Sequence, residues 1–316
     1  MDRKHLSPSR RTFIAAMGGL IMAKSTNAFA RLPESKGPSI AITIDDFGTL
    51  DSKIMTIAQR DLSIRNALDS HKIKAAGFVS GKNIDSNLGQ KLLQAWSDDG
   101  HILCNHSYSH DYYGTQDADT YWKDVMKCEK LIEPYPTFRK LFRFPYLGEG
   151  STPKTLARMR QLMAQNGYRN GVVTIDASDW YINQRMTTRH TADPKTELSQ
   201  YRQYYLDHLW DRAQYYDKLS HAVFSKSIPH TLLIHHLDLN ALFLDDVLKM
   251  FQARGWNLID AETAFETPEH KLMYDSIPSG QSLLWSAAKA KNVGGPLRYP
   301  GENDEYEIPK MDALGL

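Results

Sequence analysis

Short apolar runs alternate with longer amphipathic stretches from residue 39 to about residue 265. The short runs have the length and apolar content of buried strands, and the stretches between them repeat apolar residues at helical spacing. Strands are predicted at residues 39–44, 75–79, 102–105, 141–144, 172–175, 231–235 and 256–259. Helices are predicted near residues 56–70, 88–98, 119–132, 153–165, 198–224 and 241–254. Seven strands separated by helices favour parallel pairing through right-handed crossovers, so we expect an α/β fold, either an open doubly wound sheet or a barrel.

The C-terminal stretch breaks this alternation. Residues 266–316 are rich in proline, glycine and charge, and they show no periodic core pattern. We therefore expect one main domain over residues 37–265, with residues 266–316 as an extension that wraps and packs on it.

The first 30 residues predict a twin-arginine signal peptide. Arg10 and Arg11 precede an apolar run over residues 13–23, and Ala28 and Ala30 put small residues at both recognition positions for cleavage after Ala30. The run is too short to cross a bilayer. We expect a periplasmic or secreted protein that uses the twin-arginine export machinery and is not an integral membrane protein once cleaved. An uncleaved anchor is the alternative.

Charge and cysteine content narrow the class of partner. The formal charge is +1, and the first 30 residues hold five Lys or Arg and one acid, so their removal leaves −3. A chain without a basic excess is not expected to bind nucleic acid. Of the two cysteines, Cys104 lies in an apolar run, which favours a buried free thiol. A pair with Cys128 stays open.

Reactive side chains gather where the predicted strands end. Asp45 and Asp46 follow the first strand, His106 follows the third, Arg143 closes the fourth and His235 ends the sixth. Both candidate folds place their chemistry at the carboxyl ends of parallel strands. We therefore expect these side chains to meet at one edge of the sheet.

Asp46, His106 and His110 are the candidate metal ligands. Histidines at i and i+4 share one face if this segment makes a helical turn. Catalytic zinc commonly takes three protein ligands and keeps an open position, and two imidazoles with a carboxylate meet that requirement. Adjacent carboxylates at a strand end point in roughly opposite directions, so Asp45 needs another partner, such as a cation. The alternative is a plain turn with Asx hydrogen bonds before Gly48.

Arg143 and His235 are expected to have carboxylate partners. An arginine in an apolar strand is costly unless it is paired, although it could instead lie at an exposed strand end. A histidine that ends a buried strand can act as a general acid once a carboxylate raises its pKa. Neighbouring strand residues face opposite ways, so only one of His235 and His236 can face the site. The side chain of Trp180 could equally well line a sugar-binding groove or pack in the core.

Taken in order, five segments resemble the motifs of the polysaccharide deacetylase family, the NodB-homology domains of carbohydrate esterase family 4. The segments are residues 43–48, 106–110, 143–146, 176–180 and 233–235. The resemblance covers roughly residues 37–265. It implies a distorted (β/α) barrel with fewer than eight strands, which fits the seven strands predicted here.

The resemblance also assigns the metal and the base. Asp45 would be the general base and Arg143 would hold it. Asp46, His106 and His110 would bind one divalent ion, with zinc expected.

The remaining roles concern the acid and the substrate. By resemblance, Asp179 would orient His235 as the general acid, and the backbone amide of Tyr146 would help to bind the oxyanion. Leu233 and Trp180 would shape the acetyl pocket.

The implied activity is metal-dependent hydrolysis of N-acetyl or O-acetyl groups on a polysaccharide or oligosaccharide. The alternatives are a non-catalytic glycan-binding protein, which the presence of Asp45 and His235 disfavours, and a hydrolase of small C–N amides, which the metal triad disfavours. The sequence departs from the family pattern in that no proline follows Gly48 and His236 stands where the family often has a different residue. A further departure is Phe47, which stands between Asp46 and Gly48. We expect it to alter the first loop and narrow the groove.

Overall fold

The computed structural model describes residues 37–277, 279–293, 297 and 304–316, so the predicted signal peptide lies outside the described residues. The strands are β1 (Ser39–Asp45), β2 (Ala76–Val79), β3 (Ile102–Asn105), β4 (Phe138–Phe142), β5 (Gly148–Gly150), β6 (Arg169–Asn170), β7 (His230–His235), β8 (Asn257–Leu258) and β9 (Ser279–Gly280). The helices of eight or more residues are α1 (Ile57–Ser70), α3 (Asn87–Asp98), α4 (Ala118–Ile132), α5 (Pro153–Gln165), α6 (Asp179–Ala192), α7 (Ser199–Phe224), α8 (Asp238–Ala253) and α10 (Leu283–Ala290). Shorter helices are α2 (Gly81–Ile84), α9 (Ala261–Phe265) and α11 (Ile308–Ala313), with 3₁₀ turns at Pro145–Leu147, Glu269–Lys271 and Asp304–Tyr306.

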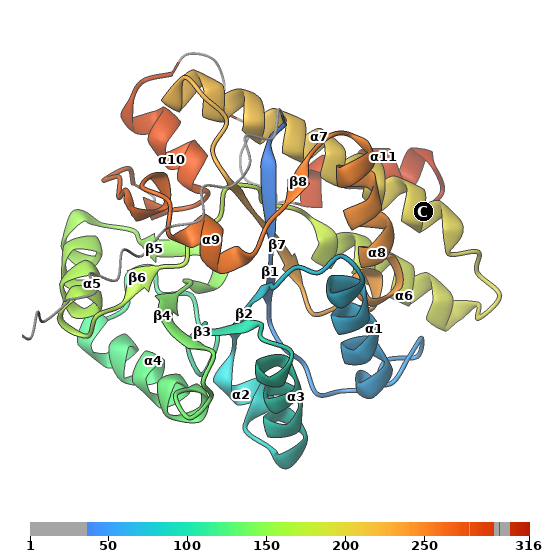
Figure 1. Ribbon diagram of the computed structural model, residues 1–316, viewed down its shortest axis with the longest axis horizontal. Coiled ribbons are helices and arrows are strands. Elements are labelled where there is room, and N and C mark those ends of the chain that lie inside the picture. The colour runs from blue at the N-terminus through green and yellow to red at the C-terminus, as the bar shows by residue number, and fades with distance from the viewer. Residues whose placement is uncertain (1–36, 278, 294–296, 298–303) are drawn as a thin grey trace, which may run out of the picture. The chain divides into compact units, whose positions relative to one another are not determined.

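A parallel sheet forms the centre of the fold (Figure 1). Its strand order is β6-β4-β3-β2-β1-β7, and β8 pairs with the start of β1. The two edges approach each other through one irregular segment. Gly171 donates its N–H to the Phe142 carbonyl after β4, while Ile175 bridges to Leu232 of β7. The sheet therefore curls into a distorted barrel, which confirms the expected fold class and decides against the open sheet.

The six predicted helices are confirmed as α1, α3, α4, α5, α7 and α8. Helix α5 shows why: Thr152 caps its first turn by accepting the Thr155 N–H, Pro153 occupies the first helical position, and Gly167 follows its end with a φ of 73°. In Figure 1 the helices lie around the outside of the curled sheet. No helix among the described residues is long and apolar enough to span a bilayer.

The main differences from the predicted elements concern one strand and one helix. Residues 172–175 form isolated bridges instead of a strand, because this segment passes from the β4 edge to the β7 edge of the sheet. Helix α6 was not predicted, because its sequence is mostly polar and buries only Asp179, Tyr181, Ile182 and Met186. Helical periodicity cannot be recognised from so few apolar positions.

Both cysteines are buried free thiols, as favoured above. Burial raises the pKa of the Cys128 thiol to about 12, so it stays protonated and packs as a small apolar side chain.

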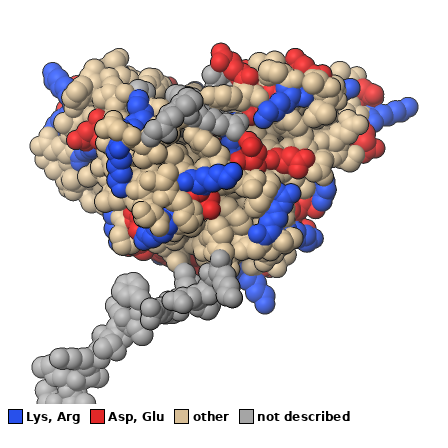
Figure 2. Space-filling model, turned by 90° about the horizontal axis from the view of Figure 1, so that it is seen from above, with Lys and Arg blue, Asp and Glu red and all other residues tan. Residues whose placement is uncertain are grey.

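Described parts of residues 266–316 contact the barrel at several points. Strand β9 pairs antiparallel with β5, and α10 packs against α7. Glu307, just before α11, is fully buried and pairs with Arg212 of α7. Figure 2 shows basic and acidic side chains interspersed over one face of the protein.

Candidate metal centre and active site

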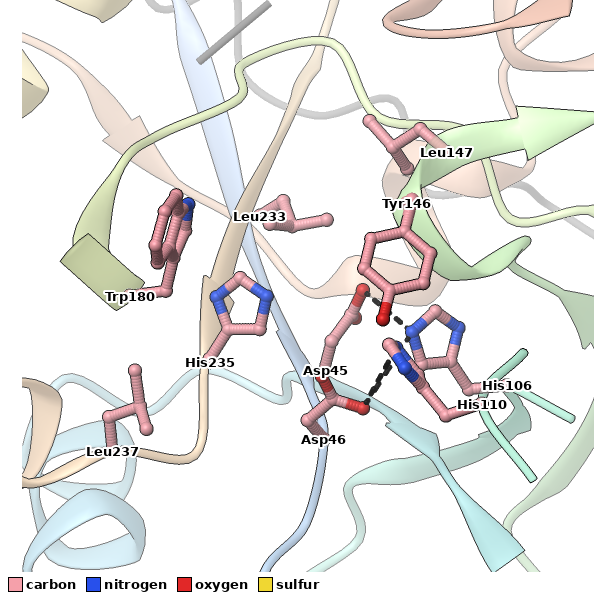
Figure 3. A pocket seen from close by; sticks show the side chains of 10 residues that line it. All are labelled: Asp45, Asp46, His106, His110, Tyr146, Leu147, Trp180, Leu233, His235 and Leu237. Carbon is pink, nitrogen blue, oxygen red and sulfur yellow. Dashed lines mark ion pairs between the residues drawn. The ribbon is translucent and has the colours of Figure 1, made fainter. Parts of the chain in front are cut away.

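The carboxyl ends of β1, β3, β4 and β7 carry the predicted site residues to one place. A cavity of about 580 Å³ opens there. Its lining residues, drawn in Figure 3, are Asp45, Asp46, His106, His110, Tyr146, Leu147, Trp180, Leu233, His235 and Leu237. Arg143 and Asp179 lie behind this wall and are completely buried. The expectation that the reactive residues share one edge is therefore met by the geometry.

Asp46, His106 and His110 form the only group of three or more potential metal-ligating residues found among the described residues. One donor atom from each lies within 4.8 Å of the other two. The Asp46 Oδ1 atom is 3.3 Å from His110 Nε2 and 3.9 Å from His106 Nε2. One carboxylate oxygen and two imidazole nitrogens at this spacing fit a zinc-like ion.

His106 and His110 lie close together although residues 106–110 do not form a helical turn. The helical turn that was assumed for this pair was therefore wrong. Residues 106–110 form an irregular loop in which Ser107 and His110 have φ values of 65° and 60°. The loop is held by short-range hydrogen bonds, since Asn105 Oδ1 accepts the Ser107 N–H and Ser107 Oγ accepts the His110 N–H. The spacing therefore identified the right pair through an incorrect local conformation.

His106 has a defined orientation. Its Nδ1 lies 2.7 Å from the Arg143 carbonyl oxygen, which can only accept, so Nδ1 carries the proton. The Nε2 atom then carries the lone pair, and it lies 3.7 Å from an oxygen of Asp45 and 3.9 Å from an oxygen of Asp46. Burial lowers the pKa of His106 to about 4, which keeps the ring neutral and suited to bind a cation.

Asp46 has a supporting partner that the sequence did not reveal. Ser80, in the turn after β2, donates its hydroxyl to Asp46 Oδ1 at 2.7 Å. Burial by itself would raise the pKa of Asp46, but its interactions with His106 and His110 lower it overall. Only the position of Ser80 directly after a predicted strand pointed toward the site.

Asp45 is paired with Arg143, as the buried arginine predicted. Arg143 Nη1 donates to Asp45 Oδ1 at 2.6 Å and to Thr43 Oγ1 at 2.9 Å, while its Nε donates to the Gly171 carbonyl at 2.8 Å. Burial raises the pKa of Asp45 to about 6, even though Arg143 acts to lower it. The second oxygen, Oδ2, lies 3.7 Å from His106 Nε2, beside the metal ligands.

His235 and Asp179 form the other titratable pair. His235 Nδ1 is 2.7 Å from Asp179 Oδ1, and Asp179 Oδ2 accepts the His235 backbone N–H at 2.7 Å. Asn240, which the sequence reasoning missed, donates to Asp179 Oδ2 at 2.8 Å. Burial would lower the pKa of His235, but the Asp179 carboxylate and the nearby acids raise it to about 10. The imidazolium Nε2 is left to face the cavity.

The remaining walls of the cavity are apolar and aromatic. Trp180 and Leu233 line it as expected, and Leu147 and Leu237 add apolar surface that was not predicted. Tyr146 is 58% exposed, has a φ of 57°, and its ring packs edge-on to the His110 ring at 5.0 Å. Figure 3 shows Tyr146 on the metal side of the cavity and Trp180 beside His235.

The side chain of Phe47 does not line the cavity, so the ring itself does not narrow the groove. This side chain is fully buried and stacks on the His236 ring, with centroids 5.0 Å apart. The left-handed backbone of Asp46, with a φ of 58°, directs Phe47 into the core. His236 is buried there too, so His235 is the histidine that lines the cavity.

Comparison with known proteins identifies the same family. The polysaccharide deacetylase family model matches residues 33–171. A peptidoglycan-N-acetylglucosamine deacetylase of Bacillus cereus is 26% identical over 110 residues, which cover 35% of this chain and 36% of the relative. The chain thus aligns with only about a third of the length of that curated relative.

Solved structures share the fold at low sequence identity. A polysaccharide deacetylase from Bacillus cereus matches with a TM-score of 0.52 and 19% identity, covering 71% of this chain and 91% of that one. A mutant peptidoglycan deacetylase from Bacillus subtilis matches with a TM-score of 0.51 and 18% identity, covering 74% and 93%. A pseudoenzyme of carbohydrate esterase family 4 from Bacillus anthracis matches with a TM-score of 0.50 and 16% identity, covering 73% and 66%. These structures share the fold, and the family model and the curated relative agree with the resemblance to the polysaccharide deacetylase family that the ordered motifs indicated.

Proposed function

We propose that this protein is an exported, metal-dependent deacetylase that hydrolyses acetyl groups on a polysaccharide or oligosaccharide. The observation that carries the proposal is the cavity in which a three-ligand metal site adjoins two separately supported titratable groups. Arg143 holds Asp45, and Asp179 holds His235. A protein that only binds glycans does not need two titratable groups that are each held by a separate charged partner.

Asp46, His106 and His110 would hold one divalent ion, and we propose zinc because the donors are two imidazole nitrogens and one carboxylate oxygen. When bound, such an ion polarises the acetyl carbonyl and lowers the pKa of a water molecule in the open position. The neutral His106 ring and the ionised Asp46 are both in the protonation state that binding requires.

Asp45 is the proposed general base. Its Oδ1 is occupied by Arg143, so Oδ2 is the atom that takes a proton from the attacking water. With its pKa at about 6, the carboxylate is ionised at neutral pH and still basic enough to accept that proton.

His235 is the proposed general acid. Its Nδ1 proton is held by Asp179, so Nε2 donates to the leaving nitrogen of an amide or the leaving oxygen of an ester.

The carbonyl carbon gains the water oxygen and loses the sugar nitrogen or oxygen, which gives acetate and the free amine or alcohol. The backbone N–H of Tyr146 would support the negative charge on the tetrahedral intermediate, while Leu233 and Trp180 enclose the methyl group.

Acetate release tests this proposal. The mature chain, reconstituted with zinc, is incubated with peptidoglycan, chitooligosaccharides, acetylxylan and an acetylated exopolysaccharide, and acetate is measured. We expect release from at least one of them, and the products distinguish amide from ester cleavage. Folded protein with bound metal and no acetate from any substrate would instead favour a non-catalytic glycan-binding protein.

A further inference from the structure

Phe47 occupies a fitted slot directly behind the metal site. Its ring is fully buried, lies edge-on to Trp96 at a centroid distance of 4.7 Å, and is stacked on His236 with an interplanar angle of 17°. Gly77 of β2 forms the floor of the slot. A Cβ at that position would lie 2.7 Å from the Phe47 Cζ atom, so only glycine allows the ring to lie there.

The ring is attached to a metal ligand by a strained link. Asp46 has a φ of 58°, a left-handed conformation that is unfavourable for a residue with a Cβ and persists only where surrounding contacts impose it. With this conformation, Phe47 points into the core while the Asp46 carboxylate lines the cavity and lies 3.3 Å from His110 Nε2. Seating the ring and presenting the carboxylate therefore depend on the same backbone turn.

His236 fixes the far side of the slot. Its backbone N–H donates to the Asp45 carbonyl at 3.0 Å, and its Nε2 lies 3.4 Å from Asp61 Oδ1. Trp96 Nε1 donates to the same Asp61 oxygen at 2.6 Å. Asp61 thus accepts a hydrogen bond from Trp96 and lies beside His236, the two residues whose rings contact Phe47.

We propose that Phe47 is a positioning residue for the metal site: its ring, locked between Gly77, Trp96 and His236, holds Asp46 in the conformation that binds the ion. This inference rests on the metal site of the proposed function. It also explains the departure from the family pattern, since the extra residue between Asp46 and Gly48 is the part that enters the slot.

The test compares Phe47→Ala and Phe47→Leu with a matched core variant, Phe251→Ala. Phe251 is also fully buried, in α8, and does not line the cavity. Zinc affinity is measured by chelator competition, the Co²⁺ absorption spectrum reports ligand geometry, and thermal unfolding reports stability. We expect Phe47→Ala to weaken zinc binding by about tenfold or more and to change the Co²⁺ spectrum, as is usual when support of a ligand is lost.

Phe47→Leu fills most of the slot and is expected to fold and to bind zinc with an affinity between those of Phe47→Ala and wild type. Phe251→Ala is expected to lower the unfolding temperature with wild-type zinc affinity and spectrum. Wild-type affinity in both Phe47 variants, or equal weakening in Phe251→Ala, would overturn the inference while leaving deacetylation untouched. Zinc binding without acetate release by the wild-type protein would overturn the proposed function alone, and a wild-type protein that binds no ion would overturn both.

Discussion

Asp45 and Asp46 are neighbours in the chain, yet the structure gives their carboxylates opposite properties. Burial raises the pKa of Asp45 to about 6, whereas the surrounding histidines outweigh burial at Asp46 and lower its pKa. One carboxylate is thereby suited to exchange a proton and the other to remain ionised. This difference arises because burial outweighs the effect of Arg143 at Asp45, whereas His106 and His110 outweigh burial at Asp46.

The variant Asp45→Asn tests the base. An amide at this position keeps the shape of the side chain but cannot accept the proton, so we expect kcat to fall by about 10²–10⁴-fold, as for loss of a general base. Zinc affinity is expected to stay within a few-fold of wild type, because Asp46, His106 and His110 are unchanged. Steady-state kinetics and chelator competition measure both quantities, and wild-type turnover in Asp45→Asn would rule out the assigned role.

The pH dependence tests the acid. His235 must be protonated to donate, so activity in the wild-type protein is expected to fall as the pH rises through about 10. The variant Asp179→Asn lacks the carboxylate that raises the pKa of His235, so this pKa should drop toward or below its ordinary value of about 6.5. The alkaline limb of the kcat profile should therefore move to lower pH by several units. An unmoved alkaline limb would mean that His235 is not the group that titrates.

At the scale of the elements, strand ends and long helices were predictable because their signals are local. Helix α7 is an example: a helix was predicted near residues 198–224, and the structure has one at Ser199–Phe224 that buries Tyr201, Tyr204, Tyr205 and Tyr216. Most of the site residues could be predicted for the same reason, because they directly follow or end the predicted strands.

What could not be predicted depends on backbone conformation or on residues distant in sequence. The inward turn of Phe47 follows from a left-handed φ at Asp46, for which the sequence gives no clear signal. Ser80 and Asn240 contact the site from separate loops and helices, so they become visible only when the fold brings them there. Helix α6 lacked a periodic apolar face but is fixed by burial of Asp179 and its neighbours.

The C-terminal segment offers an element-scale test through Glu307. This carboxylate is fully buried and bonded to Arg212 Nη2 at 3.2 Å and to the Tyr204 hydroxyl at 2.5 Å. In Glu307→Gln the Arg212 charge stays buried without its counter-ion, so we expect the free energy of unfolding to fall by about 3–5 kcal/mol. Urea denaturation measures it. As a control, Glu266→Gln disrupts more exposed pairs with Lys271 and Arg169 and should change stability by no more than about 1 kcal/mol.

The lowered pKa of Glu307 predicts how the stability difference in that test depends on pH. Burial would raise it, but His208, Tyr204 and Arg212 lower it well below its usual range. A lowered carboxyl pKa stabilises the fold above the ordinary value of about 4.3, and this contribution is lost as the pH falls toward the folded pKa. The stability difference between wild type and Glu307→Gln should therefore shrink in acid. A difference that stays constant or grows would exclude the ion pair as its source.

At the scale of the whole molecule, export is a separate prediction from catalysis. Replacing Arg10 and Arg11 with lysine removes the arginine pair of the predicted signal peptide. The net charge and the sequence of the mature chain stay unchanged. We expect the protein to accumulate in the cytoplasm of a bacterium that otherwise exports it. Cell fractionation with an antibody checks this, and undiminished export would show that another route is used.

The central claim is that one ion, held by Asp46, His106 and His110, works with Asp45 and His235 to release acetate. The most direct measurement titrates zinc into metal-free protein while acetate release from an accepted glycan is recorded. The rate should rise linearly and level off at one zinc per chain, and Asp46→Ala should remain inactive over the same range. Acetate release by metal-free protein at the full rate, or by Asp46→Ala at the wild-type rate, would contradict the account.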